Sequence, residues 1–261
     1  MDTAFENEIA WVTGGGSGIG EAAAKLLAEL GATVLCTDIN SEGVQRVAAE
    51  INQSGGTAHA MVLDVSKEED NAAAVGFCVE SLGGLHMAFL NAGYCPVGSV
   101  LDCSQESFDK TIQVNLYGAL FGLKYAGNAM KDAGTRGRIL ITGTMDSIRG
   151  SDQSAAYIAS KHGALGLMKS AAADLNPLGI RVNAVMPGLV GSPGLKRNLE
   201  EGGIPMPAAV DKPEQLARTI CFLLSNDSSL MTGQIVKLDH GFSNFTHVPG
   251  LFDFYQGNGF A

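Results

Sequence analysis

The chain has 261 residues, 46% of them hydrophobic, which is enough to bury a sizeable core in one α/β domain. It carries 17 basic and 27 acidic residues without a cluster of Lys or Arg, which disfavours nucleic acid and membrane partners. The acidic amino terminus is unlike a secretory signal and no long apolar run occurs, so we expect a cytoplasmic protein.

Short apolar runs alternate with longer Ala- and Leu-rich segments, the βαβ pattern of a parallel sheet with helices on both faces. Helical patterns occupy 20–31 and 41–56, and no long polar linker interrupts the alternation. The sequence predicts one doubly wound (Rossmann) α/β domain over residues 1–261. The seven predicted strands are 8–14, 32–38, 57–64, 85–93, 138–143, 180–188 and 234–239.

The first βα turn reads 13-TGGGSGIG-20, where glycines let backbone N–H groups approach a phosphate at a helix start. Its spacing, Gly14 followed by Gly18-x-Gly20, departs from the G-x-G-x-x-G template, so a purely structural turn is the alternative. Asp38 closes the second strand 18 residues beyond Gly20, where a carboxylate can accept hydrogen bonds from both adenosine ribose hydroxyls. The alternative for Asp38 is a residue that only starts a turn.

The charges around Asp38 favour NAD over NADP. The Asp38 carboxylate would repel a 2′-phosphate, and no Lys or Arg occurs in 14–19 or 36–41 to neutralise one. The predicted cofactor is therefore NAD, as NAD+ or NADH.

The five cysteines are odd in number and show no zinc spacing, so we expect reduced thiols and no metal site.

The segment 155–175 has a helical pattern that places Tyr157 and Lys161, four residues apart, on one face. A neighbouring ammonium stabilises a phenolate, and the positive nicotinamide ring of the oxidised cofactor adds to this, so we expect a lowered pKa for Tyr157 and proton exchange between its hydroxyl and a substrate hydroxyl. This pair also occurs on ordinary solvated helices, but the glycine-rich turn and Asp38 favour the catalytic interpretation.

Six motifs in order and spacing resemble the short-chain dehydrogenase/reductase family over residues 5–243. They are TGGGSGIG at 13–20, LDV at 63–65, NAG at 91–93, VNLYG at 114–118, YIASK at 157–161 and PG at 187–188. The resemblance implies a sheet in the order 3-2-1-4-5-6-7. It also implies a substrate lid at 189–212, with Ser192 where a threonine often meets the nicotinamide amide.

The same resemblance implies adenine contacts at Asp64 and Val65, a ribose contact at Lys161 and a proton-relay role for Asn115. We expect Asn115 to hold a water, although a buried Asn more often satisfies backbone groups. Motifs and resemblance together place the cofactor contacts at Gly14, Gly16, Ser17, Gly18, Ile19, Gly20, Asp38, Ile39, Asp64, Val65, Asn91, Ala92, Gly93, Tyr157, Lys161, Pro187, Gly188, Val190 and Ser192.

The resembling enzymes place a serine 13 residues before the tyrosine, and here that position is Thr144. Its hydroxyl can hydrogen-bond the substrate oxygen, and its added methyl takes space beside it. Ser147 is the rival, but strand alternation from Ile141 favours Thr144. The predicted catalytic residues are Asn115, Thr144, Tyr157 and Lys161.

The predicted pocket wall is mixed and mainly apolar. Asp146 would accept hydrogen bonds from a polyol or an amine where it faces the pocket, and otherwise it is a solvated loop residue. The predicted lining residues are Tyr94, Cys95, Met145, Asp146, Met186 and Leu189.

The expected function is hydride transfer between NAD and a secondary alcohol or its ketone, with a small cyclic or polyhydroxylated substrate. The alternative is a dinucleotide-binding regulator or scaffold without catalysis, a possibility that the threonine at 144 favours. An epimerase of the broader superfamily would need a larger substrate domain after residue 190.

The carboxyl-terminal extension at 244–261 follows the last predicted strand. The stretch 242–261 holds six of the chain's 17 aromatic residues, which is unlike a disordered tail. We expect it to dock on apolar surface, either over a pocket or at a remote subunit contact, in a homotetramer or homodimer.

Overall fold

The computed structural model describes residues 5–201, 203 and 210–244. Seven parallel strands form one sheet in the order β3-β2-β1-β4-β5-β6-β7, which confirms the predicted fold class and strand order. The strands are β1 (Ile9–Thr13), β2 (Thr33–Asp38), β3 (Thr57–Val62), β4 (Met87–Leu90), β5 (Arg138–Thr142), β6 (Arg181–Pro187) and β7 (Ile235–Leu238).

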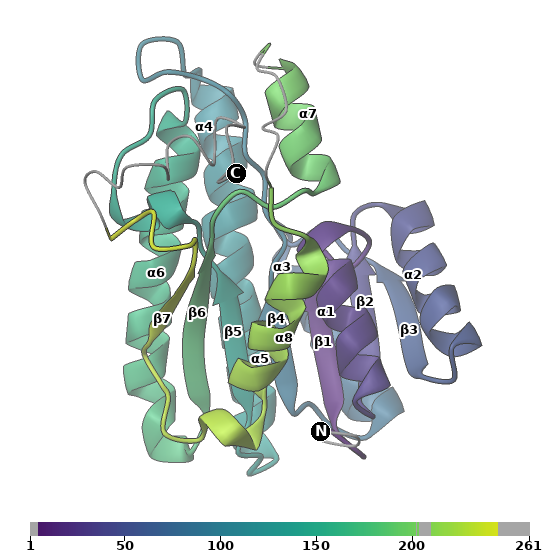
Figure 1. Cartoon of the computed structure of the whole chain (residues 1–261). Helices are drawn as coiled ribbons and strands as arrows, with labels where there is room; N and C mark the ends of the chain where they lie inside the picture. The colour runs from purple at the N-terminus through teal and green to yellow at the C-terminus, as the bar shows by residue number, and fades with distance from the viewer. Residues whose placement is uncertain (1–4, 202, 204–209, 245–261) are drawn as a thin grey trace.

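Helices cover both faces of the sheet (Figure 1). One face carries α1 (Gly18–Glu29), α2 (Ser41–Gln53) and α8 (Pro213–Leu224). The opposite face carries α3 (Glu68–Phe77), α5 (Gly118–Asp132) and α6 (Ala155–Leu175). The helices α4 (Gln105–Ile112) and α7 (Pro193–Glu201) lie near the carboxyl ends of the strands (Figure 1).

The core is divided by the sheet into two hydrophobic clusters. Along β1, Ala10 and Val12 pack in one cluster, whereas Ile9 and Trp11 pack in the other, because successive side chains of a strand point to opposite faces. The β1 strand pairs with both β2 and β4, so the strand order reverses beside it. In open α/β sheets, ligands bind at the carboxyl ends of the strands at such a reversal.

The structure agrees with most predicted element positions and corrects one. The helix at 155–175 has the predicted bounds, and α1 begins at Gly18, two residues before the predicted start at 20. The segment 189–212, predicted as a substrate lid, is rich in Gly and Pro and poor in helical periodicity, but it contains α7. Ser192 Oγ accepts a hydrogen bond from Leu195 N at 3.2 Å, so Ser192 and the proline after it begin this helix. The Gly- and Pro-rich composition of the segment obscured this helix start in the sequence.

Parts of two predicted segments lie outside the described residues: 202 and 204–209 of the lid, and 245–261 of the carboxyl-terminal extension. The division into one domain, a lid and an extension therefore stays a prediction. All five cysteines are free thiols, as expected. In the described part of the chain, every helix is too short or too polar to cross a membrane.

Candidate active site

The glycine-rich turn connects β1 to α1 in a backbone conformation that favours glycine. Gly14 and Gly18 have φ of 65° and 55°, and a Cβ at Gly20 would lie 2.0 Å from the Gly14 carbonyl oxygen. The Ser17 side chain makes no capping bond at the start of α1. The first N–H groups of this helix thus suit an anion such as a pyrophosphate.

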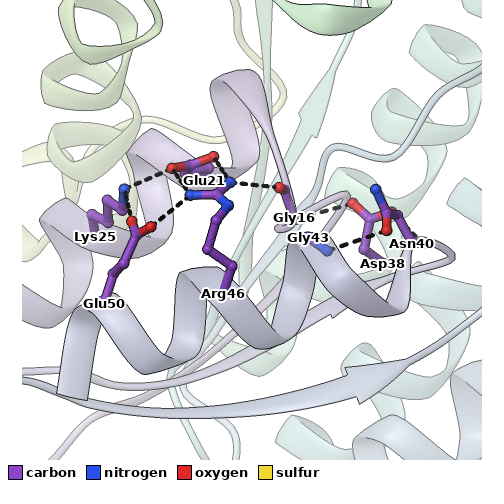
Figure 2. Close-up of polar contacts among 8 residues, drawn as sticks. All are labelled: Gly16, Glu21, Lys25, Asp38, Asn40, Gly43, Arg46 and Glu50. Carbon is purple, nitrogen blue, oxygen red and sulfur yellow. Dashed lines mark hydrogen bonds and ion pairs between the residues drawn. The ribbon is translucent and has the colours of Figure 1, made fainter. Parts of the chain in front are cut away.

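Asp38 is fixed beside this turn at the end of β2. Its Oδ2 accepts from Gly16 N at 3.0 Å and its Oδ1 accepts from Asn40 N at 2.9 Å (Figure 2). A Cβ at Gly16 would lie 3.0 Å from both Asp38 Oδ2 and Val44 N, so a glycine lets the turn approach the carboxylate. Each Asp38 oxygen keeps a lone pair that can accept from a ribose hydroxyl. This cradle fits an adenosine dinucleotide.

The two predicted adenine contacts and Ile39 lie on the same side of the site. Ile39 is 70% exposed directly after Asp38, where an adenine ring can cover it. The Asp64 carboxylate accepts from Ser66 N at 3.0 Å and from Ser66 Oγ at 2.7 Å, and Val65 is buried. Contacts of Asp64 and Val65 with adenine stay predictions.

The segment from Asn91 to Gly93 is held by two threonines at strand ends that the sequence analysis missed. Thr13 Oγ1 accepts from Asn91 N at 2.9 Å and from Ala92 N at 3.1 Å. Thr142 Oγ1 donates to Asn91 Oδ1 at 3.1 Å. These hydroxyls lie at the carboxyl ends of β1 and β5, and this position is the signal that could have identified them.

Asn115 lies in a π-helical turn, Gln113–Tyr117, between α4 and α5. Its side-chain amide accepts from Tyr94 N at 2.7 Å and donates to Tyr94 O at 2.8 Å and to Ser160 Oγ at 2.9 Å. Ser160, also missed from the sequence, donates in turn to the Tyr157 carbonyl at 2.7 Å. The Asn115 side chain therefore connects the Tyr94 loop to α6.

A small, partly open cavity of about 10 Å³ lies among Asn115, Thr142, Lys161 and eight neighbouring residues. One water needs about 10–15 Å³ and two or more polar partners. The cavity is therefore of the size and polarity that suit a single water next to Lys161.

Thr144 and Tyr157 meet where β5 gives way to a short 3₁₀ turn, Met145–Ile148. The Thr144 side chain is close enough to Tyr157 to lower the pKa of the phenol by hydrogen bonding, so the two side chains are neighbours. Ser147 is buried, and its Oγ accepts from Thr144 N at 2.8 Å as part of a local cap. The geometry brings Thr144, rather than its rival, to the tyrosine.

Lys161 is buried beneath the site. Its Nζ donates to the Thr142 carbonyl at 2.7 Å and lies 5.8 Å from the centre of the Tyr157 ring. Burial lowers the pKa of Lys161 to about 8, so the side chain is mostly protonated at neutral pH.

The expected lowering of the pKa of Tyr157 is wrong for the protein's own groups. Burial is the largest cause that raises this pKa, and repulsion from Cys95 raises it further. Hydrogen bonding by Thr144 lowers the pKa but offsets these two causes only in part. The physical reason is that desolvation disfavours a phenolate, while the ammonium of Lys161 is directed to the Thr142 carbonyl.

The predicted pocket residues Tyr94, Cys95, Met145, Asp146 and Leu189 are partly exposed near the strand ends. Burial raises the pKa of the Cys95 thiol to about 11. Asp146 Oδ1 accepts from Arg149 Nε at 2.8 Å, so its charge is compensated. Met186 was also predicted to line the pocket, but this prediction is wrong. Its side chain is 0% exposed and packs in the core, because helices cover both faces of β6.

The start of the predicted lid lies against the glycine-rich turn. Gly188 N donates to Leu238 O at 2.9 Å, and buried Val190 forms a β-bridge with Asp211. A Cβ built on Gly18 would be 3.0 Å from Ser192 Cβ. Ser192 thus lies next to the turn, and with Pro187, Gly188 and Val190 it stays a predicted cofactor contact.

Arg46 is a basic residue near the cofactor cradle, although it lies outside 14–19 and 36–41 in the sequence. From α2 its Nη2 donates to the Gly16 carbonyl at 3.2 Å (Figure 2). The pairing spans 30 positions of the chain, and no local motif predicts it.

The chain is similar in sequence and structure to known oxidoreductases. A family model described as enoyl-(acyl carrier protein) reductase matches residues 14–243. A cyclohexanol dehydrogenase of Acinetobacter sp. (strain SE19) is 38% identical over 249 residues, 94% of this chain and 98% of that protein. Short-chain dehydrogenase reductase 3a of Arabidopsis thaliana is 38% identical over 250 residues, 92% of this chain and 96% of that protein.

A solved structure of NAD+-bound xylitol dehydrogenase is 32% identical, with a TM-score of 0.83, and the match covers 89% of this chain and 98% of that chain. Because the family model covers most of the chain and both curated relatives match nearly end to end, the chain belongs to the short-chain dehydrogenase/reductase family of oxidoreductases.

Proposed function

We propose that the protein transfers a hydride between NAD and a secondary alcohol or its ketone. The observation that carries this proposal is that Tyr157 neighbours Thr144 and lies 5.8 Å, from its ring centre, from Nζ of buried Lys161, at the same carboxyl-terminal side of the sheet as the glycine-rich turn and Asp38. Bound nicotinamide would supply the hydride donor or acceptor.

The cofactor would be held along the carboxyl ends of the strands. The first turn of α1 would bind the pyrophosphate, and Asp38 would accept from the adenosine ribose hydroxyls. Lys161 would contact the other ribose, and Ser192 the carboxamide. The carboxylate at 38, already fixed by two backbone donors, supports NAD over NADP.

Tyr157 would exchange a proton with the substrate oxygen, and Thr144 would donate a hydrogen bond to that oxygen. The raised pKa keeps Tyr157 protonated at neutral pH, ready to act as an acid in ketone reduction. In the alcohol direction it must lose its proton. Lys161 would accept it after passing one of its own protons to a water in the small cavity beside Asn115, so that the ammonium is restored and the water carries the proton away.

The substrate would be a small cyclic or polyhydroxylated alcohol, or its ketone. The names of the relatives, a cyclohexanol dehydrogenase and a xylitol dehydrogenase, support both kinds. Asp146 can accept a hydrogen bond from a second hydroxyl, and its pairing with Arg149 limits the repulsion of an anionic substrate. The cytoplasmic location and assembly as a homotetramer or homodimer stay predictions.

The test is NADH fluorescence with a panel of cyclic alcohols, polyols and ketones. Turnover with NAD at a rate well above that with NADP is the expected result. Tight NADH binding without turnover on the whole panel would instead indicate a regulator or scaffold. Asp38→Ala should weaken NAD binding and relieve the exclusion of NADP, because two ribose hydrogen bonds and a repulsive charge are removed. A wild-type preference for NADPH would contradict the cofactor assignment.

A further inference from the structure

Arg46 on α2 is bound to Glu21 on α1 by a two-pronged ion pair. Arg46 Nη1 donates to Glu21 Oε1 at 2.9 Å, and Nη2 donates to Glu21 Oε2 at 2.6 Å (Figure 2). Glu21 has 19% of its side chain exposed, and the pKa of this carboxyl is lowered chiefly by the hydrogen bond from Arg46. The pair therefore stays ionised at neutral pH and links the two helices next to the glycine-rich turn.

Two further charged residues complete a closed ring. Arg46 Nη1 also donates to Glu50 Oε1 at 2.9 Å, and Lys25 Nζ lies 2.6 Å from both Glu21 Oε1 and Glu50 Oε2. Two cations and two anions make this ring neutral. Figure 2 shows it joined to Gly16 through Arg46, with Asp38 on the other side of Gly16.

All four Nη hydrogens of Arg46 are accounted for in this arrangement. Two are directed to Glu21, one to Glu50 and one to the Gly16 carbonyl. Gly16 donates its own N–H to Asp38, the carboxylate proposed to bind the ribose. The carbonyl of Gly16 is therefore bound by Arg46, and its N–H by Asp38. A guanidinium at this place is the group that would neutralise a 2′-phosphate, yet its forked donors are already paired.

We propose that Glu21 is a second determinant of cofactor choice, because it withholds Arg46 from a 2′-phosphate. This inference rests on the proposed NAD site and adds a positioning residue to it. Asp38 excludes the 2′-phosphate by charge repulsion. Glu21 acts through Arg46: by pairing with the guanidinium, it removes the attraction that would otherwise offset this repulsion. Loss of Asp38 alone would then permit NADPH to enter without a strong partner for its extra phosphate.

The experiment measures dissociation constants of NADPH and NADH by fluorescence titration of the full-length protein. Asp38→Ser alone should bind NADPH weakly, and Asp38→Ser/Glu21→Ala should bind it at least about tenfold more tightly, since a released guanidinium can form a charge-assisted pair. Adding Arg46→Met should abolish this gain. Asp38→Ser/Glu50→Ala is the matched control: it removes the same charge but leaves the Glu21 pair, and the NADPH constant should change less than about threefold.

A double variant that gains no NADPH affinity over Asp38→Ser, or a gain that survives Arg46→Met, would overturn the role of Glu21. Glu21→Gln, which keeps the side-chain size, replaces Glu21→Ala if the shorter residue unfolds the protein. Failure of the proposed function itself gives a different result, namely a wild-type protein that binds neither NADH nor NADPH.

Discussion

The β1-α1-β2 region and the β5-α6 region meet at one edge of the sheet but form their parts of the site differently. In the first, backbone groups dominate: glycines at positive φ shape the turn, and Gly16 N–H and Asn40 N–H fix Asp38. In the second, side chains dominate: Thr144 neighbours Tyr157, and Nζ of buried Lys161 lies 5.8 Å from the centre of the Tyr157 ring.

This difference determines how each region responds to substitution. A backbone cradle depends on the space left by a missing Cβ, so its changes should appear in cofactor affinity. A set of buried titratable side chains depends on desolvation and hydrogen bonding, so its changes should appear in turnover and in pH dependence.

The largest expected effect is that of Tyr157→Phe, which keeps the ring and removes the hydroxyl. We expect kcat to fall by about 10³-fold, within the range for loss of a general acid, while the NADH dissociation constant changes less than about threefold. Tyr117→Phe is the control, because the Tyr117 side chain is 47% exposed, stacks on Phe121 and is not among the predicted pocket residues. Substantial turnover by Tyr157→Phe would remove the tyrosine from the proton path.

Much of the β1-α1-β2 region was predictable because glycines and a strand-end Asp are local signals. The sheet order followed from the family resemblance, and the strands themselves from near-continuous apolar runs. Arg46 was not predictable, because its contact with Gly16 depends on how α2 packs against α1.

In the β5-α6 region, the helix was predictable from its pattern, and the pairing of Thr144 with Tyr157 was predicted from the family resemblance, but the electrostatics were not predictable. The raised pKa of Tyr157 and the lowered pKa of Lys161 follow from burial, which a sequence pattern of four-residue spacing does not report. The supporting hydroxyls of Thr13, Thr142 and Ser160 act across distant segments, and although Thr13 and Ser160 lie within two of the motifs, a motif does not report which groups their hydroxyls contact.

The second prediction separates the two hydroxyls after β5. Thr144→Ala should lower kcat by about 10²-fold, comparable to the loss of one oxyanion donor, and Thr144→Ser should keep most activity. Ser147→Ala should be mild in turnover but should lower stability by about 1 kcal/mol, because it leaves Thr144 N–H without its acceptor. Steady-state kinetics and thermal unfolding of the three variants measure this, and a near-silent Thr144→Ala beside a crippled Ser147→Ala would reverse the assignment.

The third prediction uses the buried charge of Lys161. Its pKa is lowered from 10.5 to about 8, so the folded state releases this proton earlier than the unfolded state as pH rises. The Lys161 contribution to stability is therefore poorest below about pH 8 and improves between pH 8 and 10.5. Relative to Lys161→Met, the unfolding free energy of wild type should rise by roughly 2 kcal/mol from pH 7 to 10.

The comparison with Lys161→Met cancels other groups that titrate in this range, including the buried thiols. Denaturant unfolding at several pH values provides the measurement. A difference between the two proteins that is flat from pH 7 to 10 would mean that Lys161 has an ordinary pKa in the folded protein.

The smallest expected effect compares one glycine from each region. A Cβ at Gly16 would lie 3.0 Å from Asp38 Oδ2, so Gly16→Ala should displace the carboxylate by a few tenths of an ångström. We expect the NADH dissociation constant to rise by about three- to tenfold, the cost of one weakened hydrogen bond, with kcat at saturating NAD unchanged.

Gly166→Ala in α6 is the matched control, because no atom lies within 4 Å of its added Cβ. That change should raise stability by about 0.5–1 kcal/mol through helix propensity and leave NADH affinity unaltered. Equal effects of the two substitutions on NADH affinity would mean that the approach of Gly16 to Asp38 does not set the position of the ribose.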